Sequence, residues 1–270
     1  MKLMYITNRP EVAKIAQDAG VDWIFIDLET VGKQARQGGM DTVQSRHTVA
    51  DVAAMRPHVK AGGLLVRVNP IYPGSQAEID AVIDAGADIL MLPYFKTREE
   101  VAAFLGFVRG RAKTVLLFET PEAADLAGEI AGMEGVEFCY IGLNDLHLGY
   151  GMKFMFQLLS DGTVEKLCSI FRKAGKPYGF GGIARLGGGA LPAEAVLGEH
   201  VRLGSQAVIV SRSFCNADKE TLESIEEIFS RELPRLRRCI AKWQGSDEAE
   251  LEDNRRRVVR GVDAVLEKLS

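Results

Sequence analysis

Short apolar runs alternate with amphipathic segments along the chain of 270 residues. Eight of the apolar runs are rich in strand-forming residues and have the length of buried strands. They cover residues 2–7, 23–29, 63–69, 88–94, 114–120, 137–142, 177–184 and 206–214. Runs such as Ile24-Phe25-Ile26 are apolar at consecutive positions, as parallel strands covered on both faces require. The pattern therefore predicts a largely parallel sheet.

Amphipathic helical patterns separate these strands. They cover residues 10–19, 49–57, 76–85, 97–109, 121–131, 163–174, 192–201 and 219–232. Gly20, Gly86 and Gly175 each follow a last helical turn, where glycine supplies a left-handed cap. Eight strand–helix units predict a (β/α)8 TIM barrel over residues 1–245. A doubly wound open sheet is the alternative, but no Gly-rich nucleotide-binding turn follows the first strand.

The pattern changes after the eighth unit. Gly245-Ser246-Asp247-Glu248 is a polar break, and a helical apolar stripe follows it. Residues 246–270 are therefore predicted to form an additional C-terminal helix. The stripe fits two arrangements equally well: packing on its own barrel, or exchange with a neighbouring subunit. We expect a homo-oligomer, either a dimer, a trimer or a hexamer.

Charge and composition exclude several classes of partner. The net charge of −4 provides no basic footprint for nucleic acid. No apolar run approaches the length of a membrane span, and the polar residues after Ile6 come too early for a signal peptide. The four cysteines are scattered, as in reduced proteins. These features predict a cytoplasmic protein with a small-molecule substrate and without a membrane or nucleic-acid partner.

Two carboxylates follow apolar runs, Glu119 after the fifth strand and Asp145 after the sixth. A buried strand end has no use for an unpaired charge, because burying one is costly. Oxygen ligands of this kind suit Mg²⁺ or Mn²⁺, with water and substrate completing the coordination. The alternative for Glu119 is a cap on the helix that follows it. The pair nevertheless favours a shared cation.

Further polar groups belong to the same end of the predicted barrel. Asp27 and Glu29 end the second strand, and Arg67 ends the third. Arg67 could stabilise an oxyanion or enolate, or form a salt bridge with the two acids, and both can hold at once. The segment from Gly142 to Leu146 is predicted to form a turn whose amides can receive a substrate carboxylate.

These segments resemble the successive motifs of one enzyme family. The phrases Ile-Asp-Leu-Glu at 26–29, Leu-Val-Arg-Val at 65–68, Phe-Glu-Thr at 118–120 and Ile-Gly-Leu-Asn-Asp-Leu at 141–146 are similar, in order and spacing, to those of the HpcH/HpaI aldolase and citrate lyase beta-subunit family. The resemblance implies a metal-dependent lyase that makes or breaks a carbon–carbon bond without a Schiff base.

The resemblance also implies roles for individual residues. Glu119 and Asp145 would bind a divalent metal that chelates a 2-oxo acid such as pyruvate, with an aldehyde as the second substrate. Arg67 would stabilise the enolate, and the amides of Asn144 and Asp145, after Gly142, would hold the carboxylate. Asp27 would belong to the catalytic group. A lyase for malyl- or citramalyl-type CoA thioesters and a non-catalytic metabolite-binding barrel are the alternatives.

Thr30 departs from the family pattern. Pyruvate aldolases of the family carry a histidine, the general base, directly after the Asp-x-Glu pair, and this chain has Thr30 there. His47 and His147 are candidate substitutes, and a metal-bound hydroxide is a third. We favour His47, because the loop after the second strand also supplies Asp27 and Glu29.

A glycine-rich loop at 181–190 follows the seventh strand, where many barrels bind phosphate. Its glycines, with Arg185 and Arg212, could bind the distal half of a substrate such as a sugar acid or a phosphate. A mobile linker is the alternative interpretation. The loop is not a P-loop, because no Gly-Lys-Ser or Gly-Lys-Thr follows it.

Overall fold

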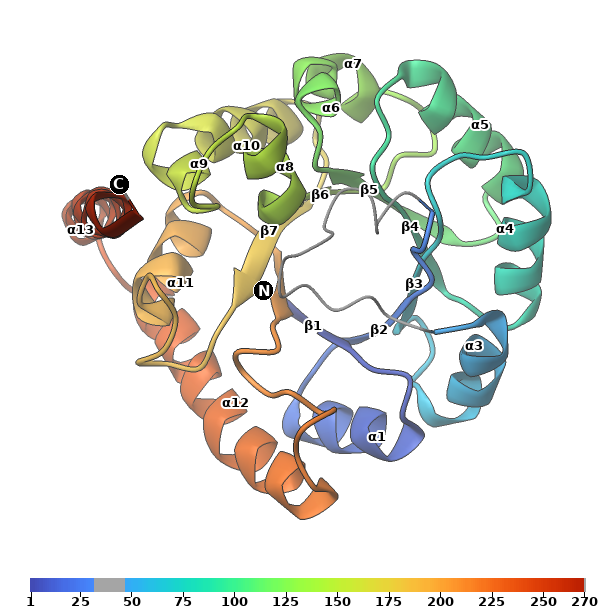
Figure 1. Ribbon diagram of the computed structural model, residues 1–270, viewed down its shortest axis with the longest axis horizontal. Coiled ribbons are helices and arrows are strands. Elements are labelled where there is room, and N and C mark those ends of the chain that lie inside the picture. Colours follow the sequence, from blue (N-terminus) through green and yellow to red (C-terminus); the bar gives the residue numbers. More distant parts are fainter. Residues whose placement is uncertain (32–46, 270) are drawn as a thin grey trace.

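Eight parallel strands form a closed barrel in the computed structural model, which describes residues 1–31 and 47–269. The strands neighbour one another in chain order, and β1 closes the ring by pairing with β8 (Figure 1). Their bounds are β1 Lys2–Ile6, β2 Trp23–Asp27, β3 Leu64–Arg67, β4 Ile89–Leu92, β5 Lys113–Phe118, β6 Phe138–Ile141, β7 Tyr178–Ile183 and β8 Ala207–Val210. The predicted (β/α)8 TIM barrel is confirmed, and the open sheet is excluded.

Helices surround the strands, as Figure 1 shows in a view along the barrel axis. Those after the first four strands are α1 Pro10–Ala19, α3 Val49–Met55 with the 3₁₀ turn η1 Arg56–His58, α4 Ser75–Asp84 and α5 Arg98–Val108. The later ones are α6 Pro121–Asp125, α7 Ala127–Ala131, α8 Leu143–Gly149, α9 Gln157–Ser160, α10 Thr163–Lys173, α11 Ala193–Arg202, α12 Leu222–Gln244 and α13 Glu248–Leu269. None of the helices in the described part of the chain has both the length and the apolar character needed to cross a membrane.

The apolar residues form two separate clusters, one on each side of the barrel wall. Met4, Phe25, Leu65 and Leu117 belong to the smaller cluster, which also contains Tyr140. The larger cluster lies between the strands and the surrounding helices. Side chains alternate between the two faces of each strand, so consecutive apolar residues supply both clusters. This double burial explains why the strands read as continuous apolar runs.

Two predictions about helices were wrong. The predicted end of the eighth helix at residue 232 is twelve residues short of the end of α12 at Gln244. Pro234 removes one backbone donor inside α12, but Leu233, Leu236 and Ile240 remain buried and continue the apolar stripe. The predicted turn at 142–146 is the first part of α8, capped by Gly142.

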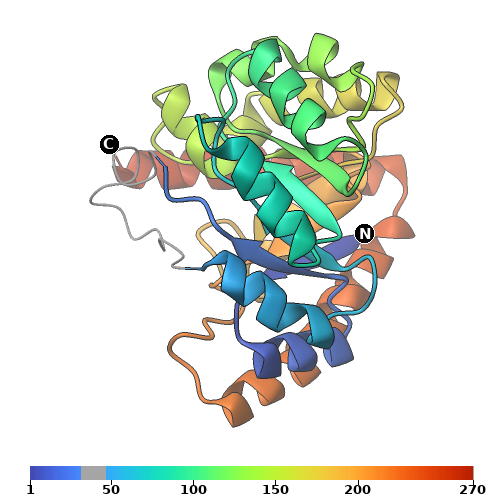
Figure 2. The same cartoon turned by 90° about the vertical axis from the view of Figure 1, so that its right-hand side faces the viewer.

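The C-terminal helix α13 packs on α11 and α9 of its own chain. It is seen end-on beside them in Figure 1 and lengthwise in Figure 2. Val258 and Val262 are buried, and the Asn254 amide donates to the Ala195 carbonyl at 2.9 Å. This is the first of the two arrangements that the sequence allowed. Exchange of the helix between subunits, like the oligomeric state, stays a prediction.

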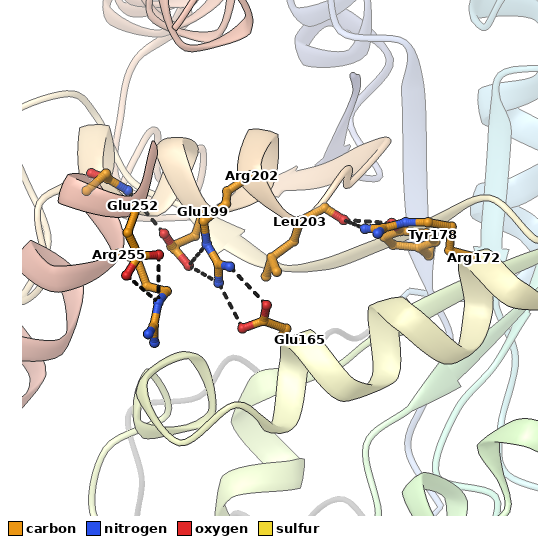
Figure 3. Close-up of polar contacts among 9 residues, drawn as sticks. Glu165, Arg172, Tyr178, Glu199, Arg202, Leu203, Glu252 and Arg255 are labelled. Carbon is orange, nitrogen blue, oxygen red and sulfur yellow. Dashed lines mark hydrogen bonds and ion pairs between the residues drawn. The ribbon is translucent and has the colours of Figure 1, made fainter. Parts of the chain in front are cut away.

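A buried carboxylate joins three helices on this side of the barrel. Glu199 of α11 receives two hydrogen bonds from Arg202, at 3.0 and 2.8 Å, and Arg202 also reaches Glu165 of α10 (Figure 3). Asn254 of α13 donates to the other oxygen of Glu199 at 3.3 Å. Burial raises the pKa of Glu199 and Arg202 opposes that shift. The network fixes the position of α13.

His200 gives the folding free energy a specific pH dependence. Its ring is stacked on Phe180 at 3.7 Å, its Nδ1 lies 2.8 Å from the Ser205 hydroxyl, and burial lowers its pKa to about 3. The unfolded chain has a histidine pKa of about 6.5. The stability contributed by neutral His200 is therefore complete above about pH 6.5 and is lost as the pH falls toward 3.

We expect His200 alone to lower the free energy of unfolding by about 2 kcal/mol between pH 7.5 and pH 5. Urea unfolding at several pH values measures this loss. A His200→Leu variant, which has no titrating group at this position, should show a correspondingly shallower dependence. Equal pH slopes for the two proteins would contradict the assignment.

Candidate active site

A cavity of about 530 Å³ opens at the carboxyl ends of the strands. All eight strands or the loops that follow them contribute to its lining. Asp27, Arg67, Glu119 and Asp145 are among the lining residues. In barrels of this type the active site lies at this end. The cavity thus unites the charged residues that the sequence placed at separate strand ends.

Arg67 and Asp27 are neighbours because of the strand register. Their Cα atoms are partners in the β2–β3 pairing. The guanidinium donates from Nε and from Nη2 to the two carboxylate oxygens of Asp27, both at 2.8 Å, and Nη2 lies 3.3 Å from Glu29. The Asp27 and Glu29 side chains are only 3% and 1% exposed, so this is a buried ion cluster. The third guanidinium nitrogen, Nη1, takes no part in the two hydrogen bonds to Asp27.

Glu119 accepts a hydrogen bond from a backbone amide on one side and lies close to a glycine on the other. The Tyr94 amide, just after β4, donates to Glu119 Oε1 at 3.0 Å. Tyr94 has a φ of 48°, an uncommon value for a residue with a side chain. On the other side lies Gly142, where an added Cβ would meet Glu119 Oε2 at 2.7 Å. The Tyr94 amide therefore binds one oxygen of the carboxylate, and Gly142 leaves the space that the other oxygen occupies.

The electrostatics of Glu119 fit a bound cation. Burial, followed by the charges of Glu29 and Asp145, raises its pKa well above the ordinary value. Arg67 and the Tyr94 amide lower this pKa, but they do not offset the increase. A divalent ion between the carboxylates would remove the repulsion, and oxygen ligands are those that Mg²⁺ and Mn²⁺ prefer.

The protein supplies only part of such a coordination shell. Within residues 1–31 and 47–269, no group of three or more His, Cys, Asp or Glu side chains is arranged to hold a metal. Mg²⁺ commonly binds through one or two carboxylates, with water and substrate as the remaining ligands. Glu119 and Asp145 fit a site of that kind, which would be completed by the substrate.

Gly142 provides a test of this geometry. In a Gly142→Ala variant the new methyl group overlaps the Glu119 carboxylate, so we expect Glu119 to move and Mn²⁺ binding to weaken. The free energy of unfolding should fall by about 1–3 kcal/mol. Calorimetry with Mn²⁺ and urea unfolding measure the two effects.

Gly106→Ala is the matched control, because nothing lies within 4 Å of the added Cβ in the last turn of α5. Alanine there should stabilise the helix by about 0.5–1 kcal/mol and leave Mn²⁺ binding unchanged. Equal Mn²⁺ affinity in both variants would contradict the proposed contact between Gly142 and Glu119.

His47 lines the cavity beside Asp27. The Asp27 backbone amide donates to His47 Nδ1 at 3.1 Å. An amide N–H can only donate, so Nδ1 is the acceptor and the neutral ring carries its proton on Nε2. This arrangement favours a hydrogen-bond donor at Nε2 over the general base that the sequence predicted.

The other predicted site residues differ in whether they line the cavity. Asn144 and Arg212 line the cavity. His147 Nδ1 is bonded to the Leu143 carbonyl of its own helix at 3.1 Å, and His147 is not part of the lining. Arg185 is also outside the lining, and its Nε donates to the Phe214 carbonyl. Its role in substrate binding stays a prediction.

Thr30 is exposed and does not line the cavity. Its amide donates to the Asn69 side-chain oxygen at 2.8 Å. The Asn69 oxygen also accepts from the amide of Val31 at 2.9 Å. Thr30 and Val31 are thus anchored by β3. The departure from the family pattern leaves no titratable group at this position.

Sequence reasoning missed two contributors to the site. The Tyr94 amide was missed because the contact depends on a backbone conformation. The segment Phe154-Met155-Phe156 lines the cavity between α8 and α9. The sequence could have indicated this segment, since three consecutive large apolar residues are unusual in a loop after a strand.

Two of the solved structures that share the fold are described as HpcH/HpaI aldolase proteins. An HpcH/HpaI aldolase/citrate lyase family protein from Burkholderia cenocepacia J2315 has a TM-score of 0.63 and 16% identity, covering 90% of this chain and 93% of the other. An HpcH/HpaI aldolase from Desulfitobacterium hafniense DCB-2 has a TM-score of 0.58 and 17% identity, covering 78% and 85%. At such identities the likeness concerns the barrel alone.

The sequence has a curated relative, a hydroxypyruvate/pyruvate aldolase of Sagittula stellata. The two are 26% identical over 172 residues, which is 52% of this chain and 61% of the relative. The match thus spans less than two thirds of the relative's length. The sequence model for HpcH/HpaI aldolase/citrate lyase matches residues 2–157, a segment that contains Asp27, Arg67, Glu119 and Asp145. This match covers more than half of the chain, which therefore belongs to the HpcH/HpaI aldolase/citrate lyase family.

Proposed function

We propose that this chain is a divalent-metal-dependent carbon–carbon lyase, an aldolase that joins or cleaves a 2-oxo acid such as pyruvate and an aldehyde. The observation that carries the proposal is the arrangement of Glu119 and Asp145 beside Arg67 in one cavity at the carboxyl ends of the strands. The name of the Sagittula stellata relative supports pyruvate as the 2-oxo acid.

Glu119 and Asp145 would hold Mg²⁺ or Mn²⁺, which when bound supplies Lewis-acid stabilisation of the charge that develops on an enolate. Glu119 reaches the site already fixed by the Tyr94 amide and by its contact with Gly142. A ligand held in place in advance does not have to reorganise during the reaction. The choice between the two ions stays open.

Arg67 would stabilise the same negative charge with its own groups. Asp27 engages Nε and Nη2, so Nη1 can donate to a substrate oxygen in the cavity. Asp27 and Glu29 orient the guanidinium in this proposal, which makes them positioning residues. The amides of Asn144 and Asp145 would receive the substrate carboxylate, as the family resemblance implies.

His47 would donate a hydrogen bond from Nε2 to an oxygen of the substrate. We expect His47→Ala to slow exchange of the pyruvate methyl protons by about 10–100-fold, and His47→Gln, whose amide can still donate, to recover part of that rate. NMR in D₂O measures the exchange. If His47 were the base, Gln would be as inactive as Ala, because an amide cannot accept the proton.

The proposed reaction is tested by pyruvate exchange in the wild-type protein. Transfer of a methyl proton to solvent water forms the enolate without an aldehyde, and a deuteron from D₂O then replaces it, so exchange should require Mg²⁺ or Mn²⁺ and stop when the metal is chelated. A protein that binds Mn²⁺ and pyruvate without exchange would be a metabolite-binding barrel. Exchange at an undiminished rate after chelation would contradict the role of the metal. Turnover of a malyl-type CoA thioester in the same buffer would favour the alternative lyase.

A further inference from the structure

We infer that the aldehyde partner carries an apolar chain or ring, which packs in the part of the cavity formed by the segments after β6 and β7. This inference rests on the proposed aldolase function and names the class of its second substrate. It differs from the sugar acid or phosphate predicted from the glycine-rich loop with Arg185 and Arg212, and the experiment below distinguishes the two.

The lining of the cavity is divided by polarity. Its polar side comes from the loops after β1 and β8, with Thr7, Asn8, Ser211 and Arg212 among its residues. The adjoining side comes from residues 154–196, since β7 is the neighbour of β8 and the Ser211 hydroxyl donates to the Ile183 carbonyl at 2.9 Å. The lining residues of this apolar wall are Phe154, Met155, Phe156, Gly181, Gly182, Ile183, Ala184, Gly189, Ala190, Leu191, Ala193 and Val196. Within the described residues of this wall, none has a polar or charged side chain.

The apolar wall is formed before any ligand binds. Leu191 and Val196 are each 2% exposed and belong to the large apolar cluster. The rings of Phe154 and Phe156 meet edge to face, with centroids 5.4 Å apart. Phe154 and Met155 are only half-buried and lie at the cavity. A rigid wall of this kind binds an apolar group without the cost of ordering side chains.

The wall adjoins the proposed metal ligands. Asp145 lies in α8, directly after β6, and Phe154 comes nine residues later in the same connection. Gly181 and Gly182 of β7 add no side chains between the proposed metal ligands and the wall. A Cβ added to Gly181 would meet Leu143 at 2.7 Å. A carbon chain that begins at the metal-bound end of the substrate can therefore extend along the wall.

The side chains of the wall offer no hydrogen-bond or ion-pair partner to an anionic or hydroxylated chain. Arg185, which directly follows Ala184 of the wall, donates to the Phe214 carbonyl and is outside the lining. Polar groups buried without hydrogen bonds are strongly disfavoured, whereas each buried methylene is favoured. The wall should therefore bind apolar chains more tightly than polar ones. Among apolar chains, the affinity should rise with the length of the chain.

The experiment measures calorimetric binding of 2-oxo acids in the presence of Mn²⁺. These compounds resemble the aldol product, because their carbons beyond C3 occupy the place of the aldehyde. We expect the affinity to rise about threefold for each methylene from pyruvate to 2-oxohexanoate. The matched compound 2-oxohexanedioate, which ends in a carboxylate, should bind at least about tenfold more weakly than 2-oxohexanoate.

Phe154→Asn and Met155→Gln place polar groups on the half-buried part of the wall, and each should flatten the dependence on chain length. Ser213→Ala alters the polar side of the same cavity and should preserve the dependence on chain length. Aldol addition of pyruvate to butanal should likewise exceed addition to succinic semialdehyde. Equal or tighter binding of the dioate by the wild type, or an unchanged length dependence in both wall variants, overturns the inference.

The proposed aldolase reaction and the proposed role of the apolar wall can each be contradicted without the other. Length-dependent binding without pyruvate exchange leaves the apolar wall in place and removes the aldolase reaction. Metal-dependent exchange together with a preference for the dioate leaves the aldolase reaction in place and removes the apolar wall.

Discussion

Replacing Glu119 by glutamine is expected to slow metal-dependent pyruvate exchange by about 1000-fold, the equivalent of about 4 kcal/mol in transition-state stabilisation. Glutamine has nearly the same shape but supplies a neutral oxygen, so Mn²⁺ binding should weaken in parallel. Calorimetry and NMR exchange measure the two losses. The Tyr94 amide can still donate to the amide oxygen of Gln, so the local geometry should survive.

The same substitution should stabilise the metal-free protein. The pKa of Glu119 is raised by burial and by the charges of Glu29 and Asp145, which means that its ionised form is disfavoured in the fold. A neutral side chain removes this repulsion, and a gain of about 1 kcal/mol would raise Tm by about 2 °C. Loss of activity together with increased stability is the behaviour of a functional site rather than a structural one.

Glu122→Gln is the matched control, because Glu122 is the nearby carboxylate in the first turn of α6 and its side chain is 48% exposed. Its loss should change the free energy of unfolding by less than about 1 kcal/mol and leave exchange intact. If Glu119→Gln keeps the wild-type exchange rate and the wild-type Mn²⁺ affinity, the assignment of Glu119 is incorrect.

Replacing Arg67 by methionine should lower the free energy of unfolding by about 3–5 kcal/mol and also abolish exchange. The guanidinium neutralises Asp27 and Glu29, whose side chains are nearly inaccessible to water. Removing one partner from a buried ion cluster leaves uncompensated charge in the interior. Urea unfolding of the metal-free protein measures the first effect.

Arg67→Lys separates charge from geometry. Lysine restores the positive charge but not the two parallel hydrogen bonds to Asp27, so it should recover more stability than activity. Arg98→Met is the control for a pair at the surface, where the side chains of Arg98 and Glu129 are 51% and 54% exposed. It should cost less than about 1 kcal/mol. A similarly small cost for Arg67→Met would contradict the buried cluster.

The barrel could be predicted from the sequence because its strands are buried on both faces. Continuous runs such as residues 114–118 have few other uses in a protein of this composition, and their alternation with helices implies parallel pairing. The end of α12 could not be predicted, since Pro234 reads locally as a stop. Burial of Leu236 and Ile240 against neighbouring helices outweighs that local preference.

The charged residues of the candidate site could be predicted from the sequence for a related reason. A carboxylate at the end of a buried strand stands out, so Glu119 and Asp145 could be paired without coordinates. The Tyr94 contact and the His47 hydrogen bond could not, because each depends on where one N–H points. The hydrogen-bond acceptor of Arg185 could not be predicted either, because the Phe214 carbonyl belongs to a different loop. Sequence identifies which groups are present, and structure determines which of them meet.

The central claim is that Glu119 and Asp145 share a divalent cation that also binds the 2-oxo acid. A crystal structure with Mn²⁺ and pyruvate, with anomalous diffraction recorded for manganese, tests it most directly. We predict one strong anomalous peak in contact with an oxygen of each carboxylate, with pyruvate oxygens completing the coordination near Arg67. Manganese bound elsewhere, or pyruvate in the cavity without manganese at these carboxylates, would contradict the claim.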